Sequence, residues 1–235
     1  MIKKVPGEFR GFSLDLNLVD LLIKTSQNSE KIDDPVKQVI QLGLQSSCSI
    51  YVRSDSSKSQ WSGSGFHVGN GLIVTAGHVI PLDADISEIN VSFDNKQFYP
   101  ANPIKSDPNI DAGVIYCEGA KRFPDLKLGD SDTLEKGDII AVIGAPEGFH
   151  DTATVGRISN LHQGLGQSAP SQAWNDIIFV DADIMEGSSG GMVIGTDGLV
   201  YGLVMGVTGQ HADVGIGESS VSPSNKIKKI LAEIV

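Results

Sequence analysis

The segment Glu186-Gly187-Ser188-Ser189-Gly190-Gly191 lies between two apolar runs, residues 177–180 and 192–194. Glycine adopts backbone angles that are closed to other residues and lets a ligand approach the main chain. If Ser189 is a nucleophile, the amides of Gly187 and Ser189, with Ser188 between them, can point at one spot beside its hydroxyl. Such a pair of donors forms the oxyanion hole that acyl transfer requires. The alternative interpretation of this segment is a flexible Gly/Ser loop.

A second segment, Thr75-Ala76-Gly77-His78-Val79, contains the base that a serine nucleophile needs. Near pH 7 the hydroxyl must give its proton to a neighbour, and histidine has a suitable pKa. His78 directly follows an apolar run and is therefore expected at the end of a strand. Because His67 alternates with apolar neighbours, it is expected to face out of its sheet. Four histidines are interpreted as structural: His67, His150, His162 and His211.

An acid is the third requirement, because it holds the imidazole in one tautomer and stabilises its positive charge. The best candidate is Asp111, a lone acid immediately before an apolar run. That placement would bury it against His78. The alternative is that Asp111 only ends the preceding turn. Asp107 is the fallback acid, although it precedes a proline in the same loop.

Length and composition restrict the class of protein. A chain of 235 residues suits one large all-β domain or two small barrels. A net charge of −11 argues against general binding to nucleic acid or to an anionic membrane. The first residues contain no unbroken apolar segment, so no secretory signal is expected and a cytoplasmic location is predicted. Cys48 and Cys117 are interpreted as buried, reduced thiols, because two cysteines do not make a disulfide framework.

The hydrophobic pattern changes near residue 45. Residues 1–45 are expected to form a helical extension, with a leucine-rich helix at 13–25 and a second helix starting at Asp34-Pro35. This extension is interpreted as a packing arm, with an oligomerisation or regulatory-partner element as the alternative. Residues 46–235 contain short strands separated by turns, including a hairpin at Gly69-Asn70-Gly71. We expect one barrel at 46–120, a second at 128–221, a long loop at 161–174, and a helix at 222–235.

Several motifs resemble those of trypsin-like serine proteases, most closely the HtrA (Deg) type. In chain order they are Gly63-Ser64-Gly65-Phe66, Thr75-Ala76-Gly77-His78-Val79, Ile110-Asp111-Ala112-Gly113-Val114, Leu128-Gly129-Asp130-Ser131-Asp132, Thr154-Val155-Gly156-Arg157-Ile158-Ser159, and the segment around Ser189. The match runs from about Cys48 to the C-terminus. The resemblance implies an all-β fold of two six-stranded antiparallel barrels of the chymotrypsin type. It also implies an endopeptidase with His78, Asp111 and Ser189 as its triad, which acts without a metal or cofactor.

Departures from the HtrA pattern bear on specificity and regulation. The sequence ends at the terminal helix, where relatives usually continue into a PDZ domain. Ser188 replaces the usual asparagine, and Glu186 and Asp183 also differ. Asp183 lies six positions before Ser189 (189 − 183), the spacing of the aspartate at the floor of the trypsin pocket. It would favour Arg or Lys at the cleaved residue; the alternative is that it turns away and the pocket takes small aliphatic side chains.

Residues 203–205 are expected to form an edge strand that pairs with an extended protein or peptide substrate. These residues are Leu203, Val204 and Met205, and their alternative role is packing within the sheet. The Gly187 turn is also expected to adopt a latent state, in which the Gly187 amide points away until a trigger acts. The rival interpretation of the whole chain is a peptide-binding scaffold that kept the fold and lost catalysis.

Overall fold

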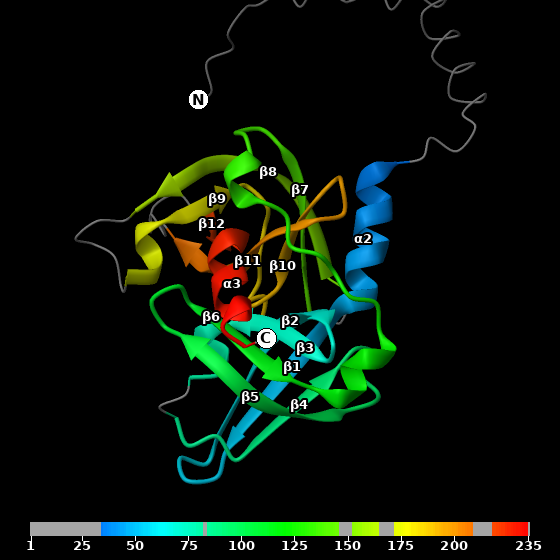
Figure 1. The fold of residues 1–235 in the computed structure, drawn as a ribbon, viewed down its shortest axis with the longest axis vertical. Helices are drawn as coiled ribbons and strands as arrows, with labels where there is room; N and C mark the ends of the chain where they lie inside the picture. Colours follow the sequence, from blue (N-terminus) through cyan, green and yellow to red (C-terminus); the bar gives the residue numbers. More distant parts are fainter. Residues whose placement is uncertain (1–33, 82–83, 146–151, 165–171, 209–217, 235) are drawn as a thin grey trace, which may run out of the picture. The chain divides into compact units, whose positions relative to one another are not determined.

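The computed structural model describes residues 34–81, 84–145, 152–164, 172–208 and 218–234. Within them, two sets of six strands each close into an antiparallel barrel (Figure 1). The strand order is β1-β2-β3-β6-β5-β4 in the first barrel and β10-β11-β12-β9-β8-β7 in the second. When each barrel is numbered from its own first strand, both rings have the same order. The prediction of two six-stranded antiparallel barrels is confirmed.

The elements have the following bounds. The first barrel consists of β1 Ser47–Ser54, β2 Ser59–Gly69, β3 Leu72–Ala76, β4 Glu88–Ser92, β5 Tyr99–Asp107 and β6 Ala112–Tyr116. The second consists of β7 Ile139–Gly144, β8 Thr152–Gln163, β9 Ile177–Val180, β10 Met192–Gly195, β11 Val200–Thr208 and β12 Glu218–Pro223. The helices are α2 Pro35–Ser46 and α3 Ser224–Ala232, with short 3₁₀ turns η1 Gly77–Val79, η2 Glu118–Arg122, η3 Ser131–Thr133 and η5 Gln172–Asn175.

The hairpin between β2 and β3 has the turn that its sequence predicts. Gly69 pairs with Leu72, so the loop consists of Asn70 and Gly71. Both loop residues have positive φ, 54° and 81°. Positive φ at both central positions defines a type I′ turn, whose twist matches that of the two strands. The hairpin directs β3 toward the end of the barrel where His78 lies.

One continuous apolar core joins the two barrels. It includes Phe66 and Ile73 inside the first barrel, together with Ile143 and Met192 on strands of the second. A separate cluster that includes Val204 fills the interior of the second barrel. Helix α3 packs against β11 of the second barrel and also contacts β6 of the first. Apolar contact between the barrels holds the loops at their junction in place, and the candidate site is built from those loops.

Helix α2 packs on the second barrel, against β7 and β10 (Figure 1). A side chain at Gly43 would bring its Cβ within 2.4 Å of Ile143 Cδ1, so the helix approaches β7 closely. Helix α2 belongs to the same compact unit as the barrels, and that unit begins at Pro35. This moves the boundary expected near residue 45 to residue 34. The helix start predicted at Asp34-Pro35 is confirmed, and the helix predicted at 13–25 lies outside the described residues.

Three local expectations need correction. His67 does not face out of its sheet: its side chain is buried, with Nδ1 3.1 Å from the Phe123 carbonyl oxygen and Nε2 accepting from the Gly71 amide. Strand β8 continues to Gln163 and η5 occupies 172–175, so the loop expected at 161–174 is shorter at both ends. The last helix begins at Ser224 rather than residue 222, because β12 extends to Pro223. Cys48 and Cys117 are buried and unbridged, as expected.

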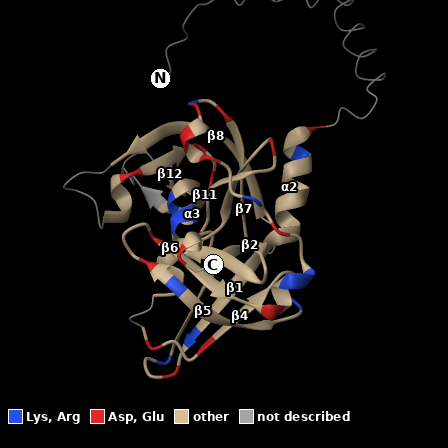
Figure 2. Cartoon of the chain, in the orientation of Figure 1, with Lys and Arg blue, Asp and Glu red and all other residues tan. Residues whose placement is uncertain are grey.

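Charged residues are interspersed over both barrels. In the view of Figure 2, Lys and Arg lie among acidic residues rather than on one continuous basic face. Neither α2 nor α3, the helices of the described part, is long and apolar enough to cross a lipid bilayer. Among the described residues, His, Cys, Asp and Glu side chains form no group suited to hold a metal ion.

Candidate active site

His78 lies on η1, directly after β3. Its neighbour Gly77 packs on the turn before β6, and a Cβ there would come within 3.2 Å of the Asp111 carbonyl carbon. The Trp61 indole fixes η1 from β2 by donating to the Val79 carbonyl at 2.8 Å. The His78 side chain remains 50% exposed. The fold therefore holds the main chain around His78 firmly while leaving the imidazole accessible to solvent.

Asp111 holds the imidazole of His78. His78 Nδ1 lies 2.9 Å and 3.0 Å from the two carboxylate oxygens of Asp111, and the His78 amide donates to the same carboxylate at 2.9 Å. The Asp111 side chain is only 14% exposed, and its φ of 49° lies in the left-handed region that aspartate tolerates. With Nδ1–H donating to the carboxylate, Nε2 is the basic nitrogen. The fallback acid Asp107 instead accepts from the backbone and side chain of Asn109.

The loop that carries Ser189 connects β9 to β10 and docks against both barrels. The Ser189 carbonyl accepts from the Ser64 amide of β2 at 2.8 Å, and the Gly190 amide donates to the Val204 carbonyl of β11 at 2.8 Å. Gly190 has φ 86°, and a Cβ there would come within 2.2 Å of the Ser64 carbonyl oxygen. Only glycine fits this position. The same point lies 2.8 Å from the Ala76 nitrogen, so the loop reaches the end of β3 that leads into His78.

The hydroxyl of Ser189 donates to the Met205 carbonyl at 3.4 Å. Within the described residues it makes no hydrogen bond to His78. Hydrogen bonds between catalytic groups are often long or misaligned before substrate binds. The structure thus brings His78 and Asp111 into direct contact and places the Ser189 loop at the same end of the first barrel.

Of the two amides expected to form an oxyanion hole, that of Gly187 lies within a defined turn and that of Ser189 directly follows it. The Ser188 amide donates to the Met185 carbonyl at 3.0 Å, and Gly187 has φ 87°. A hydrogen bond across four residues with positive φ at the third defines a type II turn. In the described part of the chain, the amides of Gly187 and Ser189 donate to no protein group. Ser188 contributes differently, because its own amide closes the turn.

Strand β11 is not an edge strand where the sequence suggested. Leu203 pairs with Met192 of β10, and Val204 is bonded on that side to the Gly191 segment. The side chains of Leu203, Val204 and Met205 are buried. Within the described ranges, residues 205–208 of β11 pair with β12 on one side only. Their other edge is therefore open. The expected edge is displaced because β10 begins only at Met192.

Asp183 and Glu186 are both exposed. The Asp183 carbonyl accepts from the Thr154 hydroxyl at 2.7 Å, which attaches this part of the loop to β8. A carboxylate at the floor of a specificity pocket would be recessed, and that of Asp183 is not. The geometry therefore gives no support to a trypsin-like pocket floor. Glu186 occupies the second position of the type II turn.

Comparison with known proteins places the chain in a family. A family described as "Trypsin-like peptidase domain" matches residues 63–203, which is more than half of the chain. The chain belongs to this family. The matched segment of this trypsin-like peptidase includes His78, Asp111 and Ser189, together with Ser64 of β2, whose amide bonds the Ser189 carbonyl.

Relatives with curated names are HtrA-type proteases, which confirms the resemblance seen in the sequence. "Serine protease HTRA1" of Xenopus tropicalis is 34% identical over 173 residues, covering 73% of this chain and 36% of that protein. "Probable periplasmic serine endoprotease DegP-like" of Chlamydia pneumoniae is 36% identical over 181 residues, covering 76% and 35%. The chain thus spans about a third of the length of these relatives.

Solved structures agree on the fold. The "HtrA-type protease AlgW with tripeptide" superposes with a TM-score of 0.73 at 23% sequence identity, covering 85% of this chain and 63% of that chain. At this identity the likeness shows the fold alone. It supports the chymotrypsin-like arrangement of the two barrels.

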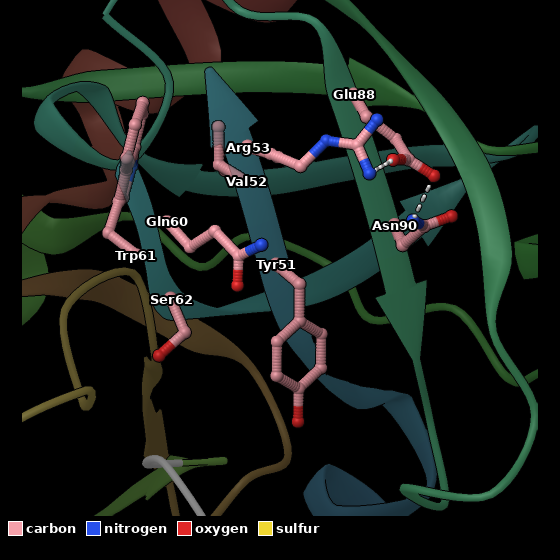
Figure 3. A pocket seen from close by; sticks show the side chains of 8 residues that line it. All are labelled: Tyr51, Val52, Arg53, Gln60, Trp61, Ser62, Glu88 and Asn90. Carbon is pink, nitrogen blue, oxygen red and sulfur yellow. Dashed lines mark hydrogen bonds and ion pairs between the residues drawn. The ribbon is translucent and has the colours of Figure 1, made fainter. Parts of the chain in front are cut away.

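A separate pocket lies on the outer face of the first barrel (Figure 3). It has a volume of about 360 Å³. Its lining residues are Tyr51, Val52, Arg53, Gln60, Trp61, Ser62, Glu88 and Asn90. Glu88 pairs with Arg53 at 2.9 Å and accepts from the Asn90 amide at 2.8 Å, so the charged groups of the pocket already have partners.

Ser64 lies beside the site, although the sequence presents it only as part of a glycine-containing motif. Ser64 lies in Gly63-Ser64-Gly65 on β2, and its hydroxyl donates to the Gly187 carbonyl at 2.7 Å. A serine between two glycines inside a strand is an unusual local choice, because glycine weakens strands and marks close backbone approach. That choice was the only indication in the sequence.

Proposed function

We propose that this chain is a serine endopeptidase domain that hydrolyses peptide bonds through an acyl-enzyme. The observation that carries the proposal is the bonded His78–Asp111 pair, beside a loop in which the amides of Gly187 and Ser189 donate to no group of the described residues. Membership of the trypsin-like peptidase family supports the same reaction. The two barrels contribute complementary parts, because His78 and Asp111 come from the first and Ser189 from the second.

In the proposed reaction Ser189 Oγ turns from the Met205 carbonyl toward His78 and attacks the substrate carbonyl. His78 Nε2 takes the hydroxyl proton and returns it to the leaving amine, while Asp111 stabilises the imidazolium. The amides of Gly187 and Ser189 donate to the oxyanion that develops. Water then attacks the acyl-enzyme with His78 as base. Each step uses groups of this chain, and none requires a metal or cofactor.

The substrate is proposed to be a protein or peptide in extended conformation. Residues 205–208 offer an open strand edge next to Ser189, and such an edge pairs with an extended chain through main-chain hydrogen bonds. The AlgW structure was determined with a tripeptide, which supports a peptide ligand for this fold. Because Asp183 is exposed, we favour small aliphatic side chains over basic ones at the cleaved residue.

A latent state is also proposed, based on the central peptide of the turn. Rotation of the Glu186–Gly187 peptide would convert the type II turn to type I and point the Gly187 amide away from the site. Within the described residues this peptide makes no hydrogen bond, so the rotation breaks none. A progress curve for casein cleavage that is linear from the start, at full rate and without an effector, would rule out latency.

Partner and location remain predictions. Residues 1–45 are proposed as an oligomerisation or regulatory element, and measuring the oligomeric state with and without this segment tests that role. The predicted cytoplasmic location is tested by cell fractionation, and the test matters because the Chlamydia relative is named periplasmic.

The rival function is a peptide-binding scaffold without catalysis, and the bond from Ser189 Oγ to Met205 rather than His78 is the observation that favours it. A fluorophosphonate probe separates the two functions. We expect labelling of Ser189, located by mass spectrometry, which is lost in Ser189→Ala and slowed in His78→Ala. Cleavage of a peptide library should follow the same order. A folded wild-type protein that stays unlabelled would contradict the proposal and support the scaffold.

A further inference from the structure

Ser64 connects the first barrel to both sides of the nucleophile. It lies on β2 with an exposed fraction of 0%. Its hydroxyl donates to the Gly187 carbonyl at 2.7 Å and accepts from the Ala145 amide at 2.9 Å. Its amide donates to the Ser189 carbonyl at 2.8 Å, and its carbonyl accepts from the Thr75 hydroxyl at 2.7 Å. Every polar atom of Ser64 therefore has a partner, and two of these partners belong to the nucleophile loop.

The hydroxyl of Ser64 holds the last peptide group of the turn. That peptide joins Gly187 to Ser188. Its carbonyl oxygen accepts from Ser64 Oγ, and its amide donates to the Met185 carbonyl. Because a peptide group is planar, hydrogen bonds at both of its ends fix the orientation of the plane.

The amide of Ser64 holds the peptide that follows the nucleophile. That peptide joins Ser189 to Gly190, and its two ends bond to Ser64 and to Val204. The Ser189 amide lies between these two fixed planes, and the Gly187 amide directly precedes the first of them. The peptide that carries the Ser189 amide is also held within the loop, because the Ser188 carbonyl accepts from the Gly191 amide at 2.8 Å. The bonds that Ser64 makes fix the planes on either side of this peptide, so the orientation of both unpaired donors depends in part on Ser64.

We propose that Ser64 is a positioning residue for the oxyanion hole, acting through Gly187 and Ser189 without touching substrate. The inference rests on the proposed function. Oxyanion donors act only within about 2.7–3.1 Å of the developing charge, and a misplacement of about 1 Å costs roughly 100-fold in rate. Removing the hydroxyl leaves the Gly187 carbonyl without its bond to β2 and the Ala145 amide without an acceptor. The Gly187–Ser188 plane is then held at one end only, by the bond from the Ser188 amide to the Met185 carbonyl.

The test compares Ser64→Ala with Ser224→Ala. Ser224 is a matched control, because it is also fully buried and its hydroxyl donates to a backbone carbonyl, that of Gly129, at 2.7 Å. We expect Ser64→Ala to lower kcat roughly 10- to 100-fold while KM changes less than about threefold. Ser224→Ala should leave kcat unchanged. A kcat in Ser64→Ala within about twofold of that in Ser224→Ala would overturn the proposal.

A second readout does not depend on catalysis. Hydrogen exchange of the segment 185–191, measured by mass spectrometry, should become faster in Ser64→Ala and stay unchanged in Ser224→Ala. Ser64→Cys keeps the size of the side chain with a weaker donor, and it replaces Ser64→Ala if the latter does not fold; its kcat and exchange should lie between the two. Unchanged exchange in the Ser64 variants overturns the proposal. Failure of the proposed function is seen separately, as a wild-type protein that the fluorophosphonate does not label.

Discussion

At the residue scale, Asp111 is the member of the proposed triad whose backbone and side chain are both constrained. It adopts a left-handed backbone conformation, and its carboxylate bonds both the ring and the amide of His78. Asp111 thus keeps a backbone conformation that only some residues tolerate, and in this conformation its carboxylate accepts hydrogen bonds from two donors. The bond to the amide fixes the start of η1, and the bond to the ring fixes the tautomer.

Replacing Asp111 by Asn should separate these roles. An amide oxygen can still accept from the His78 amide, but the side chain no longer stabilises the imidazolium or holds the same tautomer. We expect kcat of Asp111→Asn to fall roughly 10³- to 10⁴-fold with little change in melting temperature. The control is Asp107→Asn, which alters the fallback acid in its own loop. Equal losses in the two variants would show that the acid was assigned wrongly.

Cys48 provides a prediction about reactivity. Burial raises the pKa of its thiol well above the ordinary value, and the neighbouring Cys117 raises it further. A raised pKa leaves almost no thiolate, the reactive form, at pH 8. We expect native protein to resist a disulfide-exchange reagent such as DTNB, and protein unfolded in guanidinium to release two equivalents for Cys48 and Cys117. Rapid reaction of Cys48 in the native state would contradict this burial.

At the element scale, the type II turn requires positive φ at Gly187, which an alanine adopts only with strain. Gly187→Ala should favour the rotated turn and lower kcat roughly 100-fold. Gly137→Ala is a matched control, since Gly137 has φ 96° and open space around it, away from the site. Both variants should lose similar stability, but only Gly187→Ala should lose activity. Similar kcat values for both would show that the Gly187 amide is not an oxyanion donor.

The docking of α2 depends on the absence of a side chain at Gly43. Gly43→Leu would force the helix away from Ile143, and overpacking of this kind costs about 1–3 kcal/mol in the free energy of unfolding. Gln41→Leu places the same side chain on an exposed position of the helix and should cost much less. Urea denaturation of both variants measures the difference. Equal stabilities would mean that α2 does not pack closely on the second barrel.

At the scale of the whole molecule, the shared core predicts that the barrels unfold together. Trp61 lies on β2 of the first barrel and Trp174 on η5 of the second, and both pack against the same apolar cluster. Variants Trp61→Phe and Trp174→Phe each leave one reporter. Their fluorescence transitions in urea should have the same midpoint as the transition seen by circular dichroism of the same variant.

Ile143→Ala tests the connection between the barrels. Ile143 lies on β7 but belongs to the core cluster that fills the first barrel. Its truncation should lower the free energy of unfolding by about 2–5 kcal/mol and shift the transitions of both tryptophan reporters equally. A shift confined to the Trp174 reporter would show that the barrels are independent.

The sequence alone determined the fold class and identified His78, Asp111 and Ser189 as candidates for one site. The fold class follows from local patterns, because strand periodicity, hairpin residues and glycine-rich turns depend on neighbours along the chain. The choice of the three residues also rests on the resemblance to trypsin-like proteases. The contact between His78 and Asp111, which are 33 positions apart, was decided by the tertiary structure. The tertiary structure decided the inward orientation of His67, the open edge at 205–208, the place of α2 and the contacts of Ser64. Ser64 and Gly187 are 123 positions apart, and no local preference of either residue encodes their hydrogen bond. Contacts of that kind exist only after two barrels, each satisfying its own ladder of hydrogen bonds, have packed their apolar faces together.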